Sequence, residues 1–208
     1  MLPGFNLDAA ALRWVRYTLG LVPADTQTTE AERECLMRHA RGCRSLVELG
    51  VMHGATTALL RSVMADDGTI TGIDPHPPGR LGISFERLTT LREVERHRRG
   101  RAVLVRKRSD EAAATWTRPI DFLFIDADHS WTGIARDWTD WVPHVVPGGI
   151  IALHDSHSVE GREDLDSVRF TEDVVLRDPR VRRLEVVDSL TVLERVSGQG
   201  VGMRDEKH

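Results

Sequence analysis

From residue 45 onward, short apolar runs alternate with longer amphipathic segments, and this alternation limits the possible folds more than any other feature of the sequence. Strands that alternate with helices pair in parallel, because each helix carries the chain back to the edge from which it came. A chain of 208 residues is long enough for one such domain. We therefore predict an α/β fold with a doubly wound sheet. The strands are expected at 45–49, 69–73, 102–106, 121–125 and 150–153.

The clearest helix is predicted at 131–142, because its apolar residues recur at helical spacing. The apolar stripe consists of Trp131, Ile134, Trp138, Trp141 and Val142. The opposite, polar face carries Arg136, Asp137 and Asp140. Tryptophans in such a stripe more often anchor a core than line a substrate pocket, so we interpret this helix as a packing element.

The C-terminal part is expected to close the sheet with an antiparallel hairpin. A helix around 167–176 precedes two short strands, 183–187 and 191–196, which flank a turn at Asp188 and Ser189. The segment that follows is rich in glycine and charge, which is typical of a frayed terminus.

Two helices are expected before the first strand. The first stops at Gly20 and Pro23, and the second opens with Thr29 and Glu32 in capping-box spacing and ends near Gly42. The first helix is indicated by the apolar period of Leu7, Ala11, Leu12, Val15 and Leu19. We divide the single domain into a helical cap (1–44), a core (45–197) and a tail (198–208).

Composition excludes several classes of protein. Hydrophobic residues make up 40% and charged residues 29% of the chain, and no apolar run is long enough to span a membrane. The start of the chain, Met1 to Asn6, lacks the features of a secretory signal, so we expect a cytoplasmic protein without a membrane partner. Cys35 and Cys43 fit no metal or disulfide spacing and are interpreted as reduced, partly buried thiols.

The net charge of −4 argues against nucleic acid as an obligatory partner. One stretch, residues 92–108, is strongly basic although the chain as a whole is negatively charged. No aromatic residues interleave with its charges, as binding to a single strand would need, so we interpret it as a solvated surface.

A glycine turn after the first strand predicts a small-molecule site. Gly50 and Gly54 lie four residues apart, and Glu48 precedes the first glycine by two residues. Glycines at such a turn let the backbone approach a ligand, but a dinucleotide-binding turn would read G-x-G-x-x-G. A carboxylate at this position suits a cationic ligand better than a pyrophosphate. His53 and Thr56 are further candidates for cofactor binding.

Acidic groups after the second and third strands extend this candidate site. Asp74 ends the second strand, where a carboxylate can accept hydrogen bonds from both ribose hydroxyls of an adenosine, although it can also cap a turn. Ser109 and Asp110 follow the third strand, where an adenine edge would lie. Ser-Asp is also an ordinary helix cap, so both interpretations stay open there.

These motifs, taken in order, resemble class I S-adenosylmethionine-dependent methyltransferases. The resemblance is carried by Val47 to Gly54, by Asp74, and by two later blocks, 120–131 and 147–155. The sequence is most similar to a small bacterial group that includes macrolide-sugar and other natural-product O-methyltransferases and cephalosporin hydroxylase-like proteins. The resemblance implies a Rossmann-like, seven-stranded sheet in the order 3-2-1-4-5-7-6 with the last strand antiparallel. It also implies S-adenosylmethionine as the cofactor, with Asp126 among the residues that bind it.

Two polar clusters follow adjacent strands and are expected to meet at one sheet edge. Asp126, Asp128 and His129 follow the fourth strand, and His154 and Asp155 the fifth. Carboxylates with imidazole suit a divalent cation such as Mg²⁺ or Mn²⁺. The resemblance implies ligands at Asp126, His154 and Asp155. Relatives usually carry an acid in place of His154, which leaves the ion, and whether one binds, open.

Methyl transfer to a hydroxyl requires removal of the hydroxyl proton, and two residues are candidate bases. His129 is the first, because its ordinary pKa lies near neutrality, and Asp128 is the second. The predicted substrate is a hydroxylated small molecule such as a natural-product sugar. Relatives commonly form dimers or larger assemblies, but the sequence leaves the oligomeric state open.

Three alternatives remain at this stage. A nicotinamide-dependent oxidoreductase is disfavoured by Glu48 and by the missing dinucleotide turn. A catalytically silent cofactor-binding protein stays open because of His154. Metal-independent methylation through His129 is the third.

Overall fold

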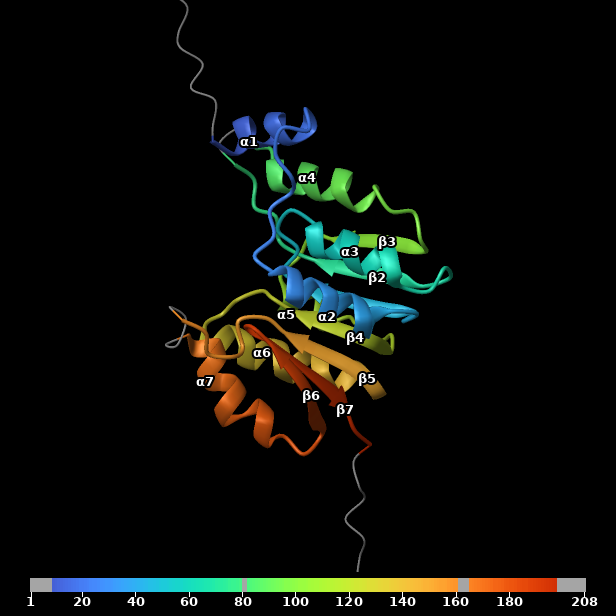
Figure 1. Cartoon of the computed structure of the whole chain (residues 1–208), viewed down its shortest axis with the longest axis vertical. Helices are drawn as coiled ribbons and strands as arrows, with labels where there is room; N and C mark the ends of the chain where they lie inside the picture. Colours follow the sequence, from blue (N-terminus) through green and yellow to red (C-terminus); the bar gives the residue numbers. More distant parts are fainter. Residues whose placement is uncertain (1–8, 80–81, 161–164, 198–208) are drawn as a thin grey trace, which may run out of the picture.

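The computed structural model describes residues 9–79, 82–160 and 165–197, which form one seven-stranded sheet with helices on both faces (Figure 1). The strands lie in the order β3-β2-β1-β4-β5-β7-β6, and β7 runs antiparallel to both of its neighbours. The predicted α/β fold class, strand order and antiparallel last strand are therefore confirmed. The strands are β1 (Ser45–Leu49), β2 (Thr69–Ile73), β3 (Arg101–Val105), β4 (Ile120–Ile125), β5 (Val145–Leu153), β6 (Val181–Val187) and β7 (Leu190–Arg195).

Helices cover the two faces of the sheet as separate layers (Figure 1). On one face, α2 and α3 pack buried leucines such as Leu36 and Leu60 against Phe122 and Phe124 of β4. On the other face, α6 buries Trp141 completely. The helices are α1 (Ala9–Thr18), α2 (Glu30–Ala40), α3 (Ala55–Val63), α4 (Phe85–Val94), α5 (Ser109–Ala113), α6 (Trp131–Trp141) and α7 (Asp166–Asp173), with short 3-10 turns at Val142–His144 and Val175–Arg177.

The capping box predicted at the start of α2 is present. The Thr29 hydroxyl accepts from the Glu32 backbone N–H at 3.1 Å, and the Glu32 carboxylate accepts from the Thr29 N–H at 2.8 Å. The two bonds satisfy donors that a helix start otherwise leaves unpaired. They also fix the Glu32 side chain, which is 1% exposed, under the helix.

Two helical faces differ from the predictions. In α6, Asp137 is buried rather than solvent-facing, because α5 packs against this side of the helix, and burial raises the pKa of Asp137 to about 6. Trp131, predicted in the apolar stripe, is 40% exposed and packs edge-on against Phe170. Leu12 and Val15 of α1, and Leu19 directly after it, are exposed, because this helix contacts α4 and lies beyond the sheet (Figure 1). Leu7 and the tail from residue 198 lie outside the described residues.

None of the described helices has the length and apolar character needed to cross a bilayer. Cys35 is a free thiol that is fully rather than partly buried, and Cys43 is a half-buried free thiol.

Candidate active site

The carboxyl ends of β1, β4 and β5 lie side by side and position the candidate residues. The backbone N–H of Asp126 donates to Leu49 O at 2.9 Å, and that of His154 donates to Ile125 O at 3.1 Å. The Gly50 N–H donates to Ile73 O at 3.0 Å on the other side. The strand ladder therefore continues one residue past each strand, which brings the glycine turn and both polar clusters to one edge.

A cavity of about 490 Å³ opens at this edge, a volume suited to a cofactor-sized ligand. It is lined by six of the nine residues predicted to bind the cofactor and by both predicted bases. These are Glu48, Gly50, Thr56, Asp74, Ser109 and Asp126, together with Asp128 and His129. Six carboxylates and one arginine line the wall, so the cavity favours a cationic ligand.

At Gly50, the glycine turn after β1 passes very close to the backbone of Asp126 at the end of β4. It has a φ of +83°, and a Cβ at this position would lie 2.1 Å from the backbone oxygen of Asp126. The glycine is therefore required both by its backbone conformation and by the packing of the turn against β4.

Asp74 holds the glycine turn while lining the cavity. Its Oδ2 accepts from the backbone N–H groups of Val51 and Met52 at 2.9 and 3.0 Å, and its Oδ1 accepts from His76 N–H at 2.7 Å. The turn-capping and ligand-binding interpretations of Asp74 are compatible, because Oδ2 already accepts two hydrogen bonds but Oδ1 accepts one and keeps its second acceptor site.

Glu48 is a buried carboxyl group at the cavity wall. It accepts a short hydrogen bond from the Thr57 hydroxyl. Burial raises the pKa of Glu48 well above its usual range, and the nearby Asp126 and Asp74 add to the shift. A cationic ligand beside Glu48 would oppose this rise in pKa and favour the charged carboxylate.

Three predicted cofactor residues do not line the cavity. His53 is buried with its Nδ1 3.6 Å from Asp25 Oδ2. Gly54 has a φ of +80° and begins α3, packed against Thr90. Asp110 pairs with Arg108 and Arg136 at 3.2 Å each. Their predicted role in cofactor binding stays a prediction, and the structure shows each in a structural contact.

The two candidate bases have different surroundings. His129 is about one-third exposed, and its ring nitrogens lie 3.6 Å from Asp126 Oδ1 and 3.9 Å from Asp155 Oδ2, too far for hydrogen bonds. Asp128 accepts from the backbone N–H of Ser130 at 3.0 Å, and this bond lowers the pKa of Asp128. A carboxylate with a lowered pKa is a weaker base, which favours His129.

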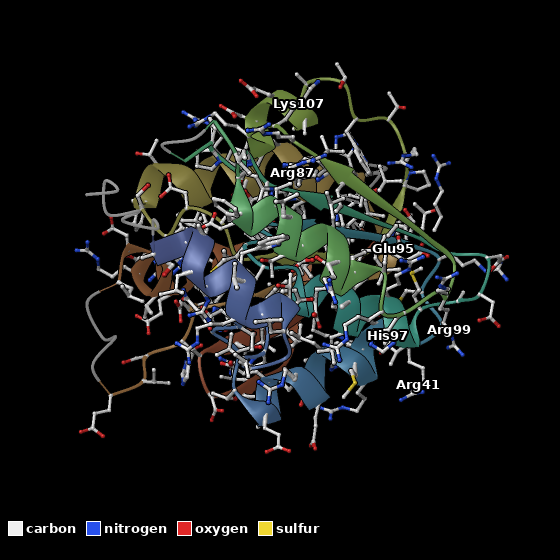
Figure 2. All side chains as sticks on the ribbon, turned by 90° about the horizontal axis from the view of Figure 1, so that it is seen from above. Arg41, Arg87, Glu95, His97, Arg99 and Lys107 are labelled. Carbon is white, nitrogen blue, oxygen red and sulfur yellow. The ribbon has the colours of Figure 1, made fainter. Side chains whose placement is uncertain are left out.

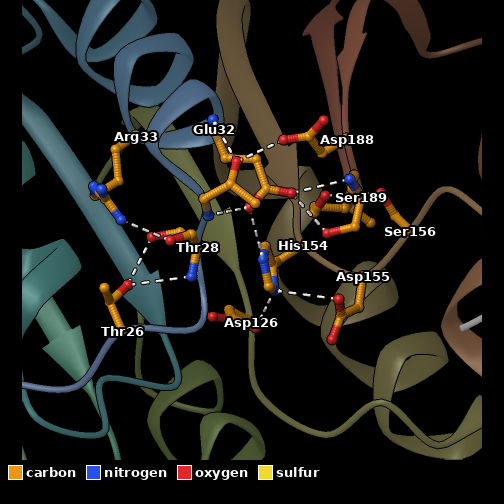
Figure 3. Close-up of polar contacts among 12 residues, drawn as sticks. Thr26, Thr28, Glu32, Arg33, Asp126, His154, Asp155, Ser156, Asp188 and Ser189 are labelled. Atoms are coloured by element: carbon orange, nitrogen blue, oxygen red, sulfur yellow. Dashed lines mark hydrogen bonds and ion pairs between the residues drawn. The ribbon is translucent and has the colours of Figure 1, made fainter. Parts of the chain in front are cut away.

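His154 lies at the centre of a buried polar network (Figure 3). Its side chain is fully buried, with Nδ1 3.1 Å from Asp126 Oδ1 and 3.7 Å from Asp155 Oδ1. Its Nε2 lies 3.3 Å from Glu32 Oε2. Burial opposes a charge on the ring, but hydrogen bonds to Asp126 and Glu32 outweigh it and raise the pKa of His154 to about 10. The predicted ligands Asp126, His154 and Asp155 are thus neighbours.

Two carboxylates and one imidazole form a donor set that suits a divalent transition-metal ion such as Mn²⁺. Ligand atoms around a small cation lie about 3 to 3.5 Å apart. The separation of 3.1 Å between His154 Nδ1 and Asp126 Oδ1 falls in this range, whereas that of 3.7 Å to Asp155 Oδ1 exceeds it. Among the described residues, the group whose three ligand atoms all lie within 4.8 Å of one another is a different one, Cys35, His39 and Glu185. Binding one ion at the predicted triad therefore requires Asp126 and Asp155 to turn toward it, and the ion would replace a proton on Nδ1.

Sequence reasoning missed the contribution of the cap to the cavity. Asp25, Thr26 and Gln27 from the loop before α2 line the wall, as does Glu86 of α4. It also missed Glu32 as a contact of His154. A capping-box glutamate carries no sequence signal for a second role, because only the packing of α2 onto the sheet brings it to β5.

A seven-stranded sheet in this order, with an acidic cavity at the carboxyl ends of its central strands, is a Rossmann-like methyltransferase fold. Residues 47–156, more than half of the chain, match a family model described as a methyltransferase domain. The chain belongs to this family, as a class I S-adenosylmethionine-dependent methyltransferase. The family assignment replaces the oxidoreductase alternative.

Solved structures with the same fold come from several bacteria. The O-methyltransferase TomG from Streptomyces achromogenes, involved in tomaymycin synthesis and solved with S-adenosylmethionine, is 15% identical over 91% of each chain, with a TM-score of 0.61. An O-methyltransferase from Bacillus cereus is 16% identical over 94% of this chain and 93% of that one, with a TM-score of 0.57. An rRNA methylase from Streptococcus thermophilus is 12% identical over 83% of this chain and 100% of that one, with a TM-score of 0.59.

Replacing Asp74 with asparagine is expected to weaken S-adenosylmethionine binding about 10- to 100-fold, because hydrogen bonds to a charged acceptor contribute about 1.5 to 3 kcal/mol. The variant keeps the shape but removes the charge and one acceptor oxygen at the glycine turn. Titration calorimetry measures the change. Asp67→Asn is the control, since Asp67 is 63% exposed in a surface ion pair. Equal affinities for Asp74→Asn and the wild type would refute the assignment.

Proposed function

We propose that this methyltransferase transfers the methyl group of S-adenosylmethionine to a hydroxyl group of a small molecule, such as the sugar of a natural product. The observation that carries the proposal is the cavity in which Glu48, Asp74 and Asp126 lie with His129. The acidic wall suits the sulfonium and ammonium charges of the cofactor. His129 supplies a base whose ring nitrogens lie 3.6 and 3.9 Å from the carboxylates of Asp126 and Asp155, beyond hydrogen-bond distance.

The chemistry requires one proton to move. The substrate hydroxyl gives its proton to a ring nitrogen of His129 while its oxygen attacks the methyl carbon, so the O–CH₃ bond forms as the S–CH₃ bond breaks. The products are a methyl ether, S-adenosylhomocysteine and a protonated His129. Asp126 and Asp155 flank the ring and would stabilise its positive charge.

We further propose that a divalent cation, Mg²⁺ or Mn²⁺, is held by Asp126, His154 and Asp155. A nitrogen ligand favours Mn²⁺ over Mg²⁺. When bound, such an ion lowers the pKa of a coordinated hydroxyl and so eases the loss of its proton. The support is the donor set and the position of His154 Nδ1, which lies 3.1 Å from Asp126 Oδ1 and 3.7 Å from Asp155 Oδ1.

A small molecule suits this chain better than nucleic acid as the substrate. The basic side chains of the stretch at 92–108 are exposed, and two of its arginines pair with acids: Arg96 with Glu93 and Arg99 with Asp66. Figure 2 shows Arg99 and Arg41 at the periphery of the molecule. These pairs offset part of the positive charge that binding to phosphates would use.

The proposal is tested by measuring S-adenosylhomocysteine and methylated product by mass spectrometry, with a panel of macrolide sugars, catechols and polyketide phenols. We expect one product methyl ether per S-adenosylhomocysteine, loss of turnover in EDTA, and recovery with Mn²⁺. Turnover that survives EDTA would leave O-methylation in place and overturn the role of the ion. Cofactor binding without turnover on any acceptor would instead favour the silent cofactor-binding protein.

A further inference from the structure

Glu32 lies outside the segment that matches the methyltransferase family model, yet its carboxylate reaches the active-site edge. It belongs to the first turn of α2 and is 1% exposed. Its Oε2 faces His154 Nε2 at 3.3 Å. A buried carboxylate is costly unless every oxygen is hydrogen-bonded, so the contacts that surround it decide what it does.

Both oxygens of Glu32 are held in place, one from the turn between β6 and β7 and the other from the N-cap of α2 itself. Oε1 accepts from the backbone N–H and the hydroxyl of Ser189, at 2.9 and 2.7 Å, in the turn between β6 and β7. Oε2 accepts from Thr29 N–H at 2.8 Å. The carboxylate is therefore fixed before it meets His154, and Figure 3 shows it between the hairpin and the His154 ring.

The orientation of the His154 ring follows from this fixed acceptor. Because a carboxylate only accepts, Nε2 carries a hydrogen when it bonds to Glu32. The other nitrogen, Nδ1, then faces Asp126 and Asp155 at 3.1 and 3.7 Å. A histidine that donates one ring N–H to a fixed carboxylate presents the other nitrogen in a set direction, the arrangement that supports histidine ligands of metal ions.

We propose that Glu32 is a positioning residue that orients His154 so that Nδ1 meets Asp126 and Asp155 as one cation-binding centre. This rests on the proposed function, and it makes the helical cap part of that centre. Glu32 is not among the residues that line the cavity, and it acts through His154.

The test is the affinity of the whole protein for Mn²⁺ alone, measured by electron paramagnetic resonance, which needs no substrate. Glu32→Gln keeps the shape and removes the charge, whereas Glu32→Asp keeps the charge and withdraws it from Nε2. We expect both variants to weaken Mn²⁺ binding about 10- to 100-fold. Glu34→Gln, an equal charge change at an exposed position of α2, is expected to leave it unchanged.

Thr29→Ala separates orientation from helix stability. It removes the other half of the capping box, so it is expected to lower the melting temperature without altering the Mn²⁺ affinity. If neither Glu32 variant folds, Ser189→Ala removes only the hydroxyl that holds Oε1, with an expected loss of about fivefold. An unchanged affinity in Ser189→Ala would then refute the proposal.

Several results would overturn the orienting role. Weakening in Glu32→Gln but not in Glu32→Asp would show a charge effect alone. Unchanged affinity in both, or no Mn²⁺ binding by the wild type, would remove the centre that Glu32 is proposed to orient. S-adenosylmethionine titrated into the same samples distinguishes this failure from failure of the proposed function, since cofactor binding without Mn²⁺ binding leaves methyl transfer in place.

Discussion

Gly50→Ala is expected to destabilise the protein by about 2 to 5 kcal/mol and to abolish S-adenosylmethionine binding. The residue has a φ of +83°, which costs an alanine free energy, and the added Cβ would lie 2.1 Å from the backbone oxygen of Asp126. The contact is with backbone atoms, which cannot move aside as the end of a flexible side chain can. The ends of β1 and β4 must therefore separate at the cavity wall. Urea unfolding monitored by tryptophan fluorescence measures the loss.

Gly42→Ala is the matched control for this prediction. Gly42 has a φ of +76°, but nothing lies within 4 Å of a Cβ built there. Gly42→Ala is therefore expected to destabilise the protein only through its strained backbone conformation, by about 1 to 2 kcal/mol. Equal destabilisation by the two substitutions would show that the contact with Asp126 does not constrain the turn.

His129→Asn is expected to lower kcat about 100- to 10,000-fold, the usual contribution of a positioned general base. Asparagine keeps a polar side chain at the cavity but cannot take up the hydroxyl proton. S-adenosylmethionine affinity is expected to stay near the wild-type value, which calorimetry checks alongside turnover of an acceptor identified by the panel.

His157→Asn is the comparison for His129, because His157 is exposed and lies three residues after His154. Its kcat is expected to match the wild type. A large loss in His157→Asn with full activity in His129→Asn would move the base to the loop after β5.

The central strands could be predicted from sequence because they are buried runs with clear ends. The predicted 45–49 and 69–73 agree with β1 and β2 residue for residue. β5 begins earlier than predicted, at Val145, because the run through Pro147 and Gly148 still pairs at its start with β4. Glycine and proline made that part look like a loop.

Contacts between distant elements could not be predicted in the same way. Nothing in the sequence of α6 shows that α5 covers Asp137, and the period of α1 does not reveal that its apolar face lies beyond the sheet. The link from Glu32 to His154 spans 122 positions and depends on how α2 packs. Short-range spacing therefore predicted the elements and the residues at the strand ends. The residues that the N-terminal helices contribute to the site could be found only from the folded structure.

The central claim is that the acidic cavity at the ends of β1, β2 and β4 binds S-adenosylmethionine, and calorimetric titration of the wild-type protein with this cofactor tests it most directly. We predict one site per chain with a dissociation constant between about 1 μM and 1 mM, in the range of substrate affinities of enzymes. If neither S-adenosylmethionine nor S-adenosylhomocysteine binds to a protein that circular dichroism shows to be folded, the central claim is contradicted.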